Sequence, residues 1–307
     1  MSRDGWRGLV FGAVLGMLCP VLAVAQTYGE RLGWGPADRV LIIHCDDIGM
    51  SNANNEGARE ALAFGLVTSV SVMMPCPWVP GWLPDVEKNP DLDVGLHLTL
   101  TSEYDHYRWT PLAGKNQVPG LTDKQGCLPD SVDLVKKNAT ADEVELEIRA
   151  QIDRAQSMGL PITHMDSHMG TLFQPEFIER YVKVGIEKQI PILMAPQAGD
   201  IAKKVWDGGL PVIDHIHTAS YNWKTTNIDE KVGLYVDAIK NLKPGVTEMI
   251  IHCTKPDDTI GLINGNRDFL YGDYFAMIDQ RTKDAIKAEG IILTTWKELK
   301  ARRDKAK

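Results

Sequence analysis

Two adjacent carboxylates, Asp46 and Asp47, lie just beyond the apolar run at residues 40–43, which is typical of a buried strand. At the carboxyl end of a strand in a parallel α/β fold, such carboxylates are suited to bind a metal ion or to exchange protons with a substrate. A turn followed by a helix cap at Ser51 would explain one aspartate. It does not explain two, because neighbouring buried carboxylates need a cation or a raised pKa. The pair therefore indicates a functional site.

A second cluster follows the apolar start of a predicted strand at residue 162. His164, Asp166 and His168 occupy alternate positions, so an extended backbone would direct all three side chains to the same side. Imidazoles and a carboxylate are good ligands for zinc and similar divalent ions, which predicts a metal site. The alternative is a surface strand with solvated histidines.

Two further histidines lie in apolar runs. His97 alternates with Leu96 and Leu98 and would point into a barrel, although a lone inward histidine is typical of a hydrogen-bonded core residue. His252 ends the run at 248–252, where an imidazole could protonate a leaving group. Each signal is weak alone, but together they predict that side chains from several strands meet at one face.

Strands whose carboxyl ends meet are needed to position these residues. Apolar runs alternate with helical patterns such as 52–64 and 176–186, which predicts parallel βαβ units. Thr140 begins a predicted capping box, and Gly159 is expected to end the helix that follows. A count of about eight strands is typical of a (β/α) barrel. The strand candidates are residues 40–43, 68–74, 94–100, 162–164, 192–195, 212–215, 248–252 and 291–295.

Length and composition limit the class of protein. The chain has 307 residues, 44% of them hydrophobic and 24% charged, and its formal net charge is −8. This charge argues against nucleic acid as a partner, because phosphate backbones are bound by basic faces. No repeat or linker divides the body of the chain, and a barrel of about 250 residues is a common single unit. We therefore expect one (β/α)-barrel domain over residues 26–307.

The first 25 residues resemble a secretory signal peptide. Arg3 and Arg7 precede an uncharged run at residues 8–25 that ends in Ala-Val-Ala, a small-x-small cleavage pattern. An uncleaved membrane anchor is the alternative, and Pro20 together with the Ala-Val-Ala ending favours cleavage. We expect an exported protein, periplasmic or secreted, with no stable membrane insertion after cleavage.

The cysteines beyond residue 25 are too few and too widely spaced for a disulfide scaffold. Cys45 and Cys253 lie in apolar strand contexts and are expected to be buried. Cys76 and Cys127 lie in loop contexts and are the expected pair if a disulfide forms.

The motifs taken together resemble those of the YdjC/ChbG-type carbohydrate deacetylases. They occur in the order of that family and span nearly all of the chain after residue 25. The resemblance implies an irregular (β/α) TIM-like barrel, related to polysaccharide deacetylases, that holds one divalent metal ion. The matching segments are residues 46–51 with 54–55, 65–69, 95–99, 164–168, 244–248 with His252, and Arg267.

Carried onto this sequence, the resemblance makes Asp47, His97 and His168 the metal ligands. It makes Asp46 the general base and His252 the general acid. The implied reaction removes an acetyl group from an N-acetylated sugar or oligosaccharide, with a metal-activated water as nucleophile. Zinc and magnesium are the expected ions, and manganese and cobalt also suit such ligands.

Three further residues are implied to support the ligands or to contact the substrate: His164, Asp166 and Arg267. The sequence departs from the family pattern in two places, because residues 169–172 replace further histidines and Met194 stands where an arginine is expected. Both places are expected to face the substrate, which predicts retained activity with altered specificity. Five aromatic residues are expected to stack on sugar rings or to pack at the barrel rim: Trp78, Trp82, Tyr104, Tyr107 and Trp109.

Two other functions fit part of the sequence. A glycoside hydrolase would use Asp46 and Asp166 as a carboxylate pair and would need no metal. A carbohydrate-binding or metal-binding exported protein would lack turnover. The histidines argue against the first, and the presence of both Asp46 and His252 argues against the second.

Overall fold

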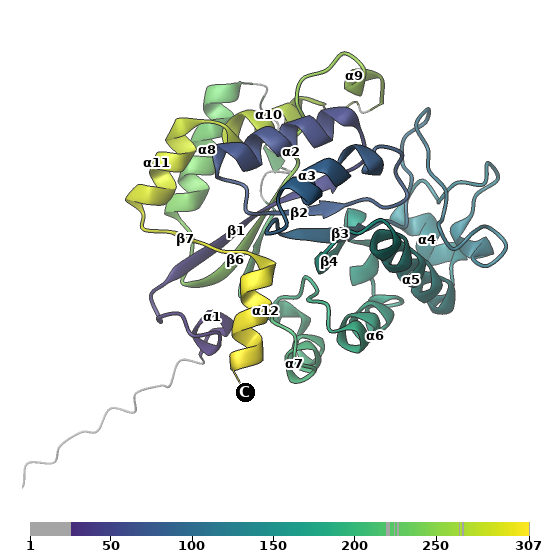
Figure 1. Cartoon of the computed structure of the whole chain (residues 1–307), viewed down its shortest axis with the longest axis horizontal. Coiled ribbons are helices and arrows are strands. Elements are labelled where there is room, and N and C mark those ends of the chain that lie inside the picture. The colour runs from purple at the N-terminus through teal and green to yellow at the C-terminus, as the bar shows by residue number, and fades with distance from the viewer. Residues whose placement is uncertain are drawn as a thin grey trace, which may run out of the picture.

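The protein forms a parallel sheet surrounded by helices, as seen in a computed structural model (Figure 1). The structure describes residues 26–218, 222–223, 225, 227–263, 265 and 267–306. The expected signal peptide, residues 1–25, lies outside this part of the chain. No helix within the described ranges is both long enough and apolar enough to cross a membrane.

Seven strands form the sheet in the described residues, and all their pairings are parallel. The order is β4-β3-β2-β1-β6-β5, and β7 pairs with β1. This arrangement confirms the predicted α/β barrel-like class. The strands are β1 (Arg39–Ile48), β2 (Ser69–Val72), β3 (Val94–Leu98), β4 (Ile162–Ser167), β5 (His215–His217), β6 (Gly245–Ile251) and β7 (Ile292–Leu293).

The strand predicted at residues 192–195 does not form, since this segment makes only a single bridge to β4. Prolines lie on both sides of the segment and cannot donate to a ladder. The segment still links the two ends of the sheet. The Leu193 amide donates to the Met165 carbonyl at 2.9 Å, and the Ile213 amide donates to the Met194 carbonyl at 3.0 Å. Irregular backbone therefore closes the barrel between β4 and β5.

The helices begin and end largely where local signals predict. The Ser51 side chain accepts the Asn54 amide at the start of α2, which ends at Gly65 in the left-handed conformation. The predicted capping box of Thr140 and Glu143 is present. The α-helices are α1 (Tyr28–Arg31), α2 (Asn52–Phe64), α3 (Leu83–Lys88), α4 (Val132–Asn138), α5 (Ala141–Ser157), α6 (Ile178–Lys188), α7 (Asp200–Asp207), α8 (Ile228–Lys240), α9 (Ile260–Ile263), α10 (Arg267–Met277), α11 (Gln280–Ala288) and α12 (Trp296–Lys305), and the short 3₁₀ segments are η1 (Val79–Gly81), η2 (Pro119–Leu121), η3 (His168–Phe173) and η4 (Pro196–Ala198).

The four cysteines of the described residues are free thiols, and Cys76 and Cys127, the expected pair if a disulfide formed, are not joined. Each of the two cysteines is held in a separate turn. The Cys76 amide donates to the Met73 carbonyl at 2.9 Å, and the Cys127 amide donates to Asp123 Oδ1 at 3.0 Å. The other two cysteines are buried, as predicted.

Candidate active site

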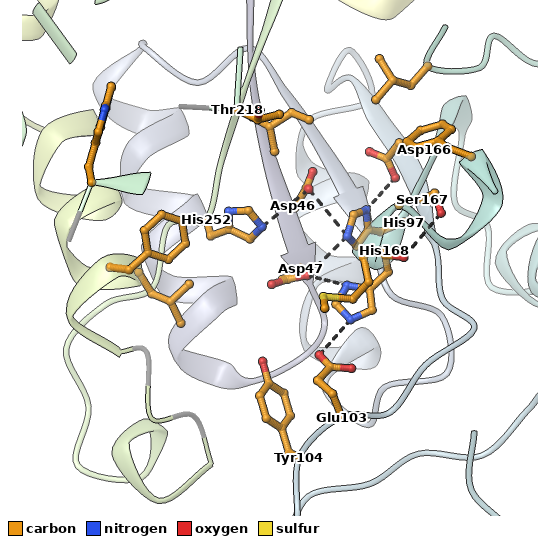
Figure 2. Close-up of a pocket in the computed structure, with 18 of the residues that line it drawn as sticks. Asp46, Asp47, His97, Glu103, Tyr104, Asp166, Ser167, His168, Thr218 and His252 are labelled. Atoms are coloured by element: carbon orange, nitrogen blue, oxygen red, sulfur yellow. Dashed lines mark hydrogen bonds and ion pairs between the residues drawn. The ribbon is translucent and has the colours of Figure 1, made fainter. Parts of the chain in front are cut away.

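A cavity of about 1000 Å³ lies at the carboxyl ends of β1, β3, β4 and β6. Figure 2 shows the predicted base, ligands and acid gathered around it, with Glu103 and Tyr104 on one side. This is the face on which parallel barrels carry their functional groups. Its carboxylate and imidazole lining residues within the described ranges are Asp46, Asp47, His97, Glu103, Asp166, His168, His252 and Asp268.

A bulge in β1 brings the two aspartates to the same cavity. Neighbouring side chains of a regular strand point to opposite faces. Between Cys45 and Ile48, however, β1 has one more residue than the facing part of β2, and Asp47 adopts the left-handed conformation with φ of 66°. This conformation costs a residue other than glycine about 1–3 kcal/mol, and such strain is found at functional sites. The bulge breaks the alternation, so that both carboxylates can line the site.

Asp47, His97 and His168 form a group that could hold a metal ion. Oδ1 of Asp47 is buried, and no hydrogen-bond partner for it exists among the described residues. It lies 3.5 Å from Nε2 of His97 and 3.4 Å from Nδ1 of His168. Ligand atoms bound about 2.0–2.2 Å from a tetrahedral ion lie about 3.3–3.6 Å from one another. The donor types and their spacing therefore fit a divalent ion.

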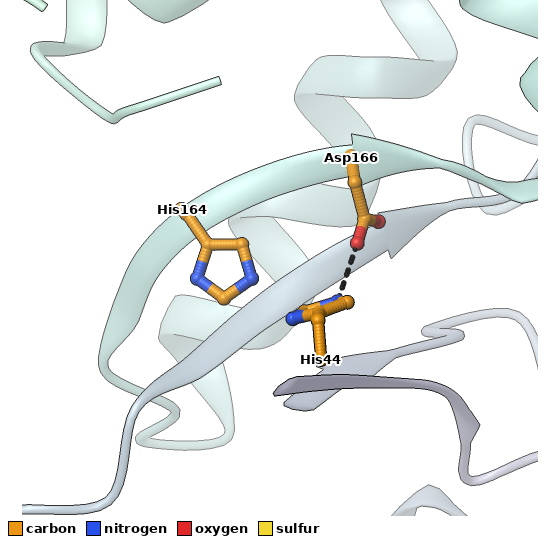
Figure 3. Close-up of side chains that lie close together, drawn as sticks. All are labelled: His44, His164 and Asp166. Atoms are coloured by element: carbon orange, nitrogen blue, oxygen red, sulfur yellow. Dashed lines mark hydrogen bonds and ion pairs between the residues drawn. The ribbon is translucent and has the colours of Figure 1, made fainter. Parts of the chain in front are cut away.

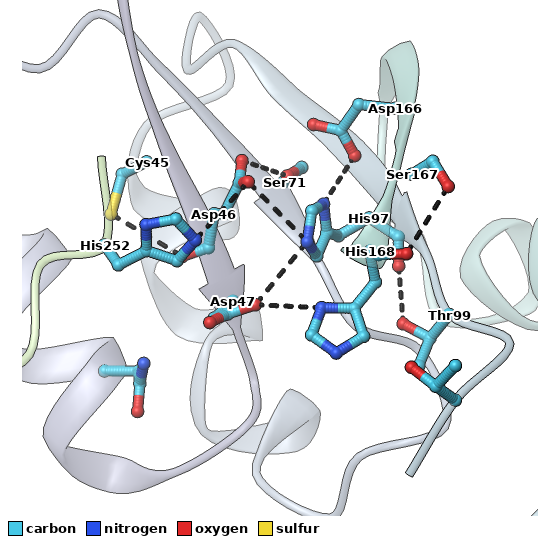
Figure 4. A network of polar contacts seen from close by, with 12 residues as sticks. Cys45, Asp46, Asp47, Ser71, His97, Thr99, Asp166, Ser167, His168 and His252 are labelled. Atoms are coloured by element: carbon cyan, nitrogen blue, oxygen red, sulfur yellow. Dashed lines mark hydrogen bonds and ion pairs between the residues drawn. The ribbon is translucent and has the colours of Figure 1, made fainter. Parts of the chain in front are cut away.

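A carboxylate supports the far side of each of these imidazoles. Nδ1 of His97 donates to Oδ1 of Asp166 at 2.7 Å (Figure 4), and Nε2 of His168 donates to Oε1 of Glu103 at 2.9 Å (Figure 2). Carboxylates in this position fix the tautomer and the orientation of a metal-binding histidine. Burial would lower the pKa of His168, but the charges and hydrogen bonds of Glu103 and Asp47 together outweigh burial and raise it. Sequence reasoning missed Glu103, whose signal was only a carboxylate shortly after the strand of His97.

Asp46 and His252 face each other beside this group. Oδ2 of Asp46 lies 3.7 Å from Nε2 of His252 and 3.6 Å from Nε2 of His97. The other oxygen, Oδ1, lies 3.1 Å from Nε2 of His44, so one oxygen of Asp46 is held while the other faces the reaction space. A candidate proton acceptor and a candidate proton donor thus lie next to the group that could hold a metal ion.

Asp273 of α10 supports His252 and was also missed. Its Oδ2 accepts the His252 backbone amide at 3.0 Å and lies 3.9 Å from Nδ1 of the same residue. Its Oδ1 accepts from the Tyr235 hydroxyl at 2.6 Å and forms an ion pair with Lys231 at 3.0 Å. A lone aspartate within the aromatic stretch at 269–275 was the available signal.

The predicted cluster of His164, Asp166 and His168 is buried, so the alternative of a solvated surface strand is wrong. Its members also separate. His168 joins the metal-binding group, Asp166 supports His97, and His164 stacks on Trp296 in the barrel interior, with 5.5 Å between ring centroids. Burial lowers the pKa of His164 to about 4, so this imidazole is neutral.

His44, His164 and Asp166 also lie close enough to suggest a metal site (Figure 3). In His44, however, Nδ1 bonds with the Ser69 hydroxyl at 2.9 Å, and Nε2 donates to Asp166 Oδ2 at 2.8 Å. Both nitrogens are therefore engaged, and neither His44 nor His164 lines the cavity. These contacts identify a hydrogen-bonded interior network.

The two departures from the family pattern, residues 169–172 and Met194, lie differently relative to the cavity. Met169 and Gly170 line the cavity, as expected. Met194 is buried and does not line it, because in the irregular closing segment its neighbour Leu193 takes that position. Arg267 begins α10, and its side chain lies outside the described part of the structure.

One of the five predicted aromatic residues, Tyr104, lines the cavity. Trp82 and Trp109 are buried in the core, which is the packing alternative. The remaining aromatic lining comes from loops and helices that the sequence did not single out as part of the site. These residues are Phe173, Trp223 and Phe269.

Fold and site together define a parallel α/β barrel with an Asp-His-His group at its strand ends that could hold a divalent ion. A sequence model of the family described as YdjC-like protein matches residues 40–288, and the chain belongs to this family. It is 32% identical over 237 residues to a carbohydrate deacetylase of Thermus thermophilus. The matched region covers 74% of this chain and 81% of the relative. A carbohydrate deacetylase of Thermoanaerobacter pseudethanolicus is 27% identical over 264 residues, with coverage of 85% and 100%.

The fold also resembles that of a crystal structure from Enterococcus faecalis V583. The TM-score is 0.74 at 23% sequence identity, and the match covers 86% of this chain and 99% of that one. The likeness extends over nearly the whole described structure and supports the barrel fold.

Proposed function

We propose that this protein is a divalent-metal-dependent hydrolase that removes acetyl groups from N-acetylated sugars or oligosaccharides. The observation that carries the proposal is the buried Oδ1 of Asp47, which lacks a hydrogen-bond partner in the described structure and lies between His97 and His168. Asp46 and His252 lie beside it in one cavity. The names of the two relatives point to the same chemistry.

Asp47, His97 and His168 would hold the ion. A bound divalent ion supplies Lewis acidity, which activates a water molecule and stabilises negative charge on the acetyl oxygen. Zinc and magnesium are the proposed ions, with manganese and cobalt as alternatives, since imidazole and carboxylate ligands suit all four.

Asp46 is the proposed general base. Its Oδ2 faces the cavity and takes a proton from the water whose oxygen bonds to the acetyl carbon. His44 holds the opposite oxygen at 3.1 Å and so orients the carboxylate toward the water.

His252 is the proposed general acid. It donates the Nε2 proton to the sugar nitrogen as the carbon–nitrogen bond breaks, so that acetate and a free amine leave. Asp273 accepts the His252 backbone amide at 3.0 Å and thereby fixes the position of this residue. Tyr104, Phe173 and Trp223 in the lining offer apolar faces to sugar rings.

The glycoside-hydrolase alternative requires Asp166 as a proton donor or nucleophile. Both of its oxygens accept hydrogen bonds, Oδ1 from His97 and Oδ2 from His44. Burial favours the protonated form, but His97 and His44 outweigh it and hold the pKa of Asp166 well below its usual range. An engaged and ionised carboxylate is unsuited to either role.

We also propose export, on the basis of the signal-like residues 1–25. Mass spectrometry of protein purified from the periplasm or medium of an expressing bacterium should find an amino terminus at Gln26. Full-length protein confined to the cytoplasm would contradict this proposal.

Acetate release from a panel of N-acetylated and O-acetylated sugars and oligosaccharides tests the reaction. The proposal predicts release from N-acetylated members and a free amine in equal amount. Cleavage of glycosidic bonds, or tight sugar binding without any product, would favour one of the two alternatives.

A further inference from the structure

We propose that Glu103 is a positioning residue that sets which nitrogen of His168 faces the metal ion. The inference deepens the proposed function, because it concerns the ion that Asp47, His97 and His168 would hold. It adds a residue outside the family motifs to the machinery of the site. Glu103 itself would not touch the ion.

The two nitrogens of His168 have different neighbours. Nδ1 lies 3.4 Å from Oδ1 of Asp47, and Nε2 donates to Oε1 of Glu103 at 2.9 Å. A neutral imidazole carries one N–H and one lone pair. If Nε2 keeps its hydrogen on Glu103, the lone pair is on Nδ1 and points toward Asp47. Glu103 thereby selects the tautomer that binds the ion.

His168 lies at a turn of the backbone, and Glu103 contacts its ring. His168 begins η3, in which Met169 and Gly170 have positive φ angles of 55° and 63° instead of helical ones. These two residues also line the open cavity. Glu103, in contrast, is anchored, since its second oxygen accepts from the Thr101 hydroxyl at 3.3 Å. The side chain of Glu103 is only 18% exposed. An anchored carboxylate can therefore hold the imidazole of His168 in one orientation.

Chain connectivity links this contact to the other histidine. Glu103 follows β3, the strand that carries His97. One segment thus supplies a metal-binding imidazole and the carboxylate that orients the second imidazole, which belongs to η3 after β4. Conversely, Asp166 of β4 orients His97 of β3 by accepting a hydrogen bond from its Nδ1.

The test is the affinity for Zn²⁺, measured by competition with a chromogenic chelator, in the variants Glu103→Ala and Glu103→Gln. Loss of a carboxylate that orients a metal-binding histidine weakens metal binding about 10–100-fold. Glu103→Ala should show such a loss. Glu103→Gln should show a smaller one, because an amide oxygen still accepts from Nε2 without its negative charge.

Asp268→Asn is the matched control. Asp268 is an exposed carboxylate that lines the same cavity, and no contact between it and His168 is seen in the described structure. This variant removes the same unit of negative charge and should leave the affinity for Zn²⁺ nearly unchanged. An equal loss in Asp268→Asn and Glu103→Ala would mean that cavity charge, and not orientation, is responsible, and would overturn the proposal.

Nitrogen-15 NMR of the metal-free protein gives a readout that charge and folding would not mimic. His168 should carry its hydrogen on Nε2 in the neutral wild-type ring and should lose this preference in Glu103→Ala. Unchanged tautomer and unchanged Zn²⁺ affinity in Glu103→Ala would refute the role of Glu103. Wild-type protein whose affinity for Zn²⁺ depends on Glu103 as predicted, but which releases no acetate, would refute the proposed function alone.

Discussion

Oδ2 of Asp46 lies 3.7 Å from Nε2 of His252, although the two residues are 206 positions apart in the sequence. Sheet pairing explains their proximity. Cys45 of β1 is the register partner of Ile251 of β6. Asp46 is the next residue of β1, and His252 directly follows the end of β6. The proposed base and acid are therefore set opposite each other by a parallel ladder, and the bulge after Cys45 leaves Asp47 free to join the metal-binding group.

Replacing Asp46 by asparagine should stop proton removal without removing a metal ligand. General base catalysis contributes about 10²–10⁴-fold, so acetate release should fall by that factor. Metal content, measured by elemental analysis of the same sample, should stay at the wild-type level. Activity within a few-fold of wild type would assign the base to another residue.

Replacing Asp273 by asparagine should weaken the support that Asp273 gives to the backbone of His252. The variant weakens the acceptor of the His252 amide, so kcat should fall at least about tenfold, a part of the 10²–10⁴-fold that a general acid contributes. KM and the affinity for Zn²⁺ should stay constant. A raised KM or weaker metal binding in step with the lower kcat would instead show a merely structural role.

The interior imidazole of His164 depends on the absence of a side chain at Gly95. A Cβ at this position would lie 2.5 Å from Cε1 of His164, so Gly95→Ala should destabilise the fold by about 1–3 kcal/mol. In a His164→Ala background the same change should cost at least about 1 kcal/mol less, because the clash is gone. Urea unfolding of the four proteins measures both costs. Equal costs in the two backgrounds would show that the two residues do not interact.

Glu248 should make stability depend on pH. Its carboxyl is buried and accepts from Nε1 of Trp296 at 2.7 Å, and burial raises its pKa from 4.5 to about 8. The folded state thus binds this proton more tightly than the unfolded state does. The stabilisation is complete below pH 4.5 and is lost progressively as the pH rises toward about 8.

Glu248→Gln removes this titration. Between pH 5.5 and 8.5, with chelator present, the wild-type free energy of unfolding should fall more than that of the variant, by about 3 kcal/mol. Glu176→Gln, at an exposed position, should behave as wild type. Parallel curves for wild type and Glu248→Gln would contradict the raised pKa.

Local signals in the sequence were sufficient for much of the fold. The helix at 52–64 was predicted with its observed bounds because Ser51 caps it and Gly65 ends it. The segment 192–195 is as apolar as a strand, but its pairing depends on neighbours that are distant in sequence. A short apolar run cannot reveal whether a partner strand is within reach of its backbone.

The site was predictable where its residues lie on strand ends and less so elsewhere. Asp46, Asp47, His97 and His252 follow or end apolar runs, which is a local signal. His164 lies on the same strand as Asp166, yet its ring packs in the core, against Trp296 and in the space beside Gly95. Glu103 and Asp273 come from a loop and a helix, and spacing along the chain does not show which imidazole each one meets.

The central claim is that an ion held by Asp47, His97 and His168 is required for deacetylation. The most direct measurement is acetate release from an N-acetylated oligosaccharide by a single preparation of the enzyme. Release is measured before chelation, after removal of divalent ions and after the ions are added back. His97→Ala is measured in parallel. We expect wild-type release to disappear with the ion and to return with it. His97→Ala should bind no ion tightly and should release no acetate at any stage. Full release by metal-free wild type, or by His97→Ala, would contradict the claim.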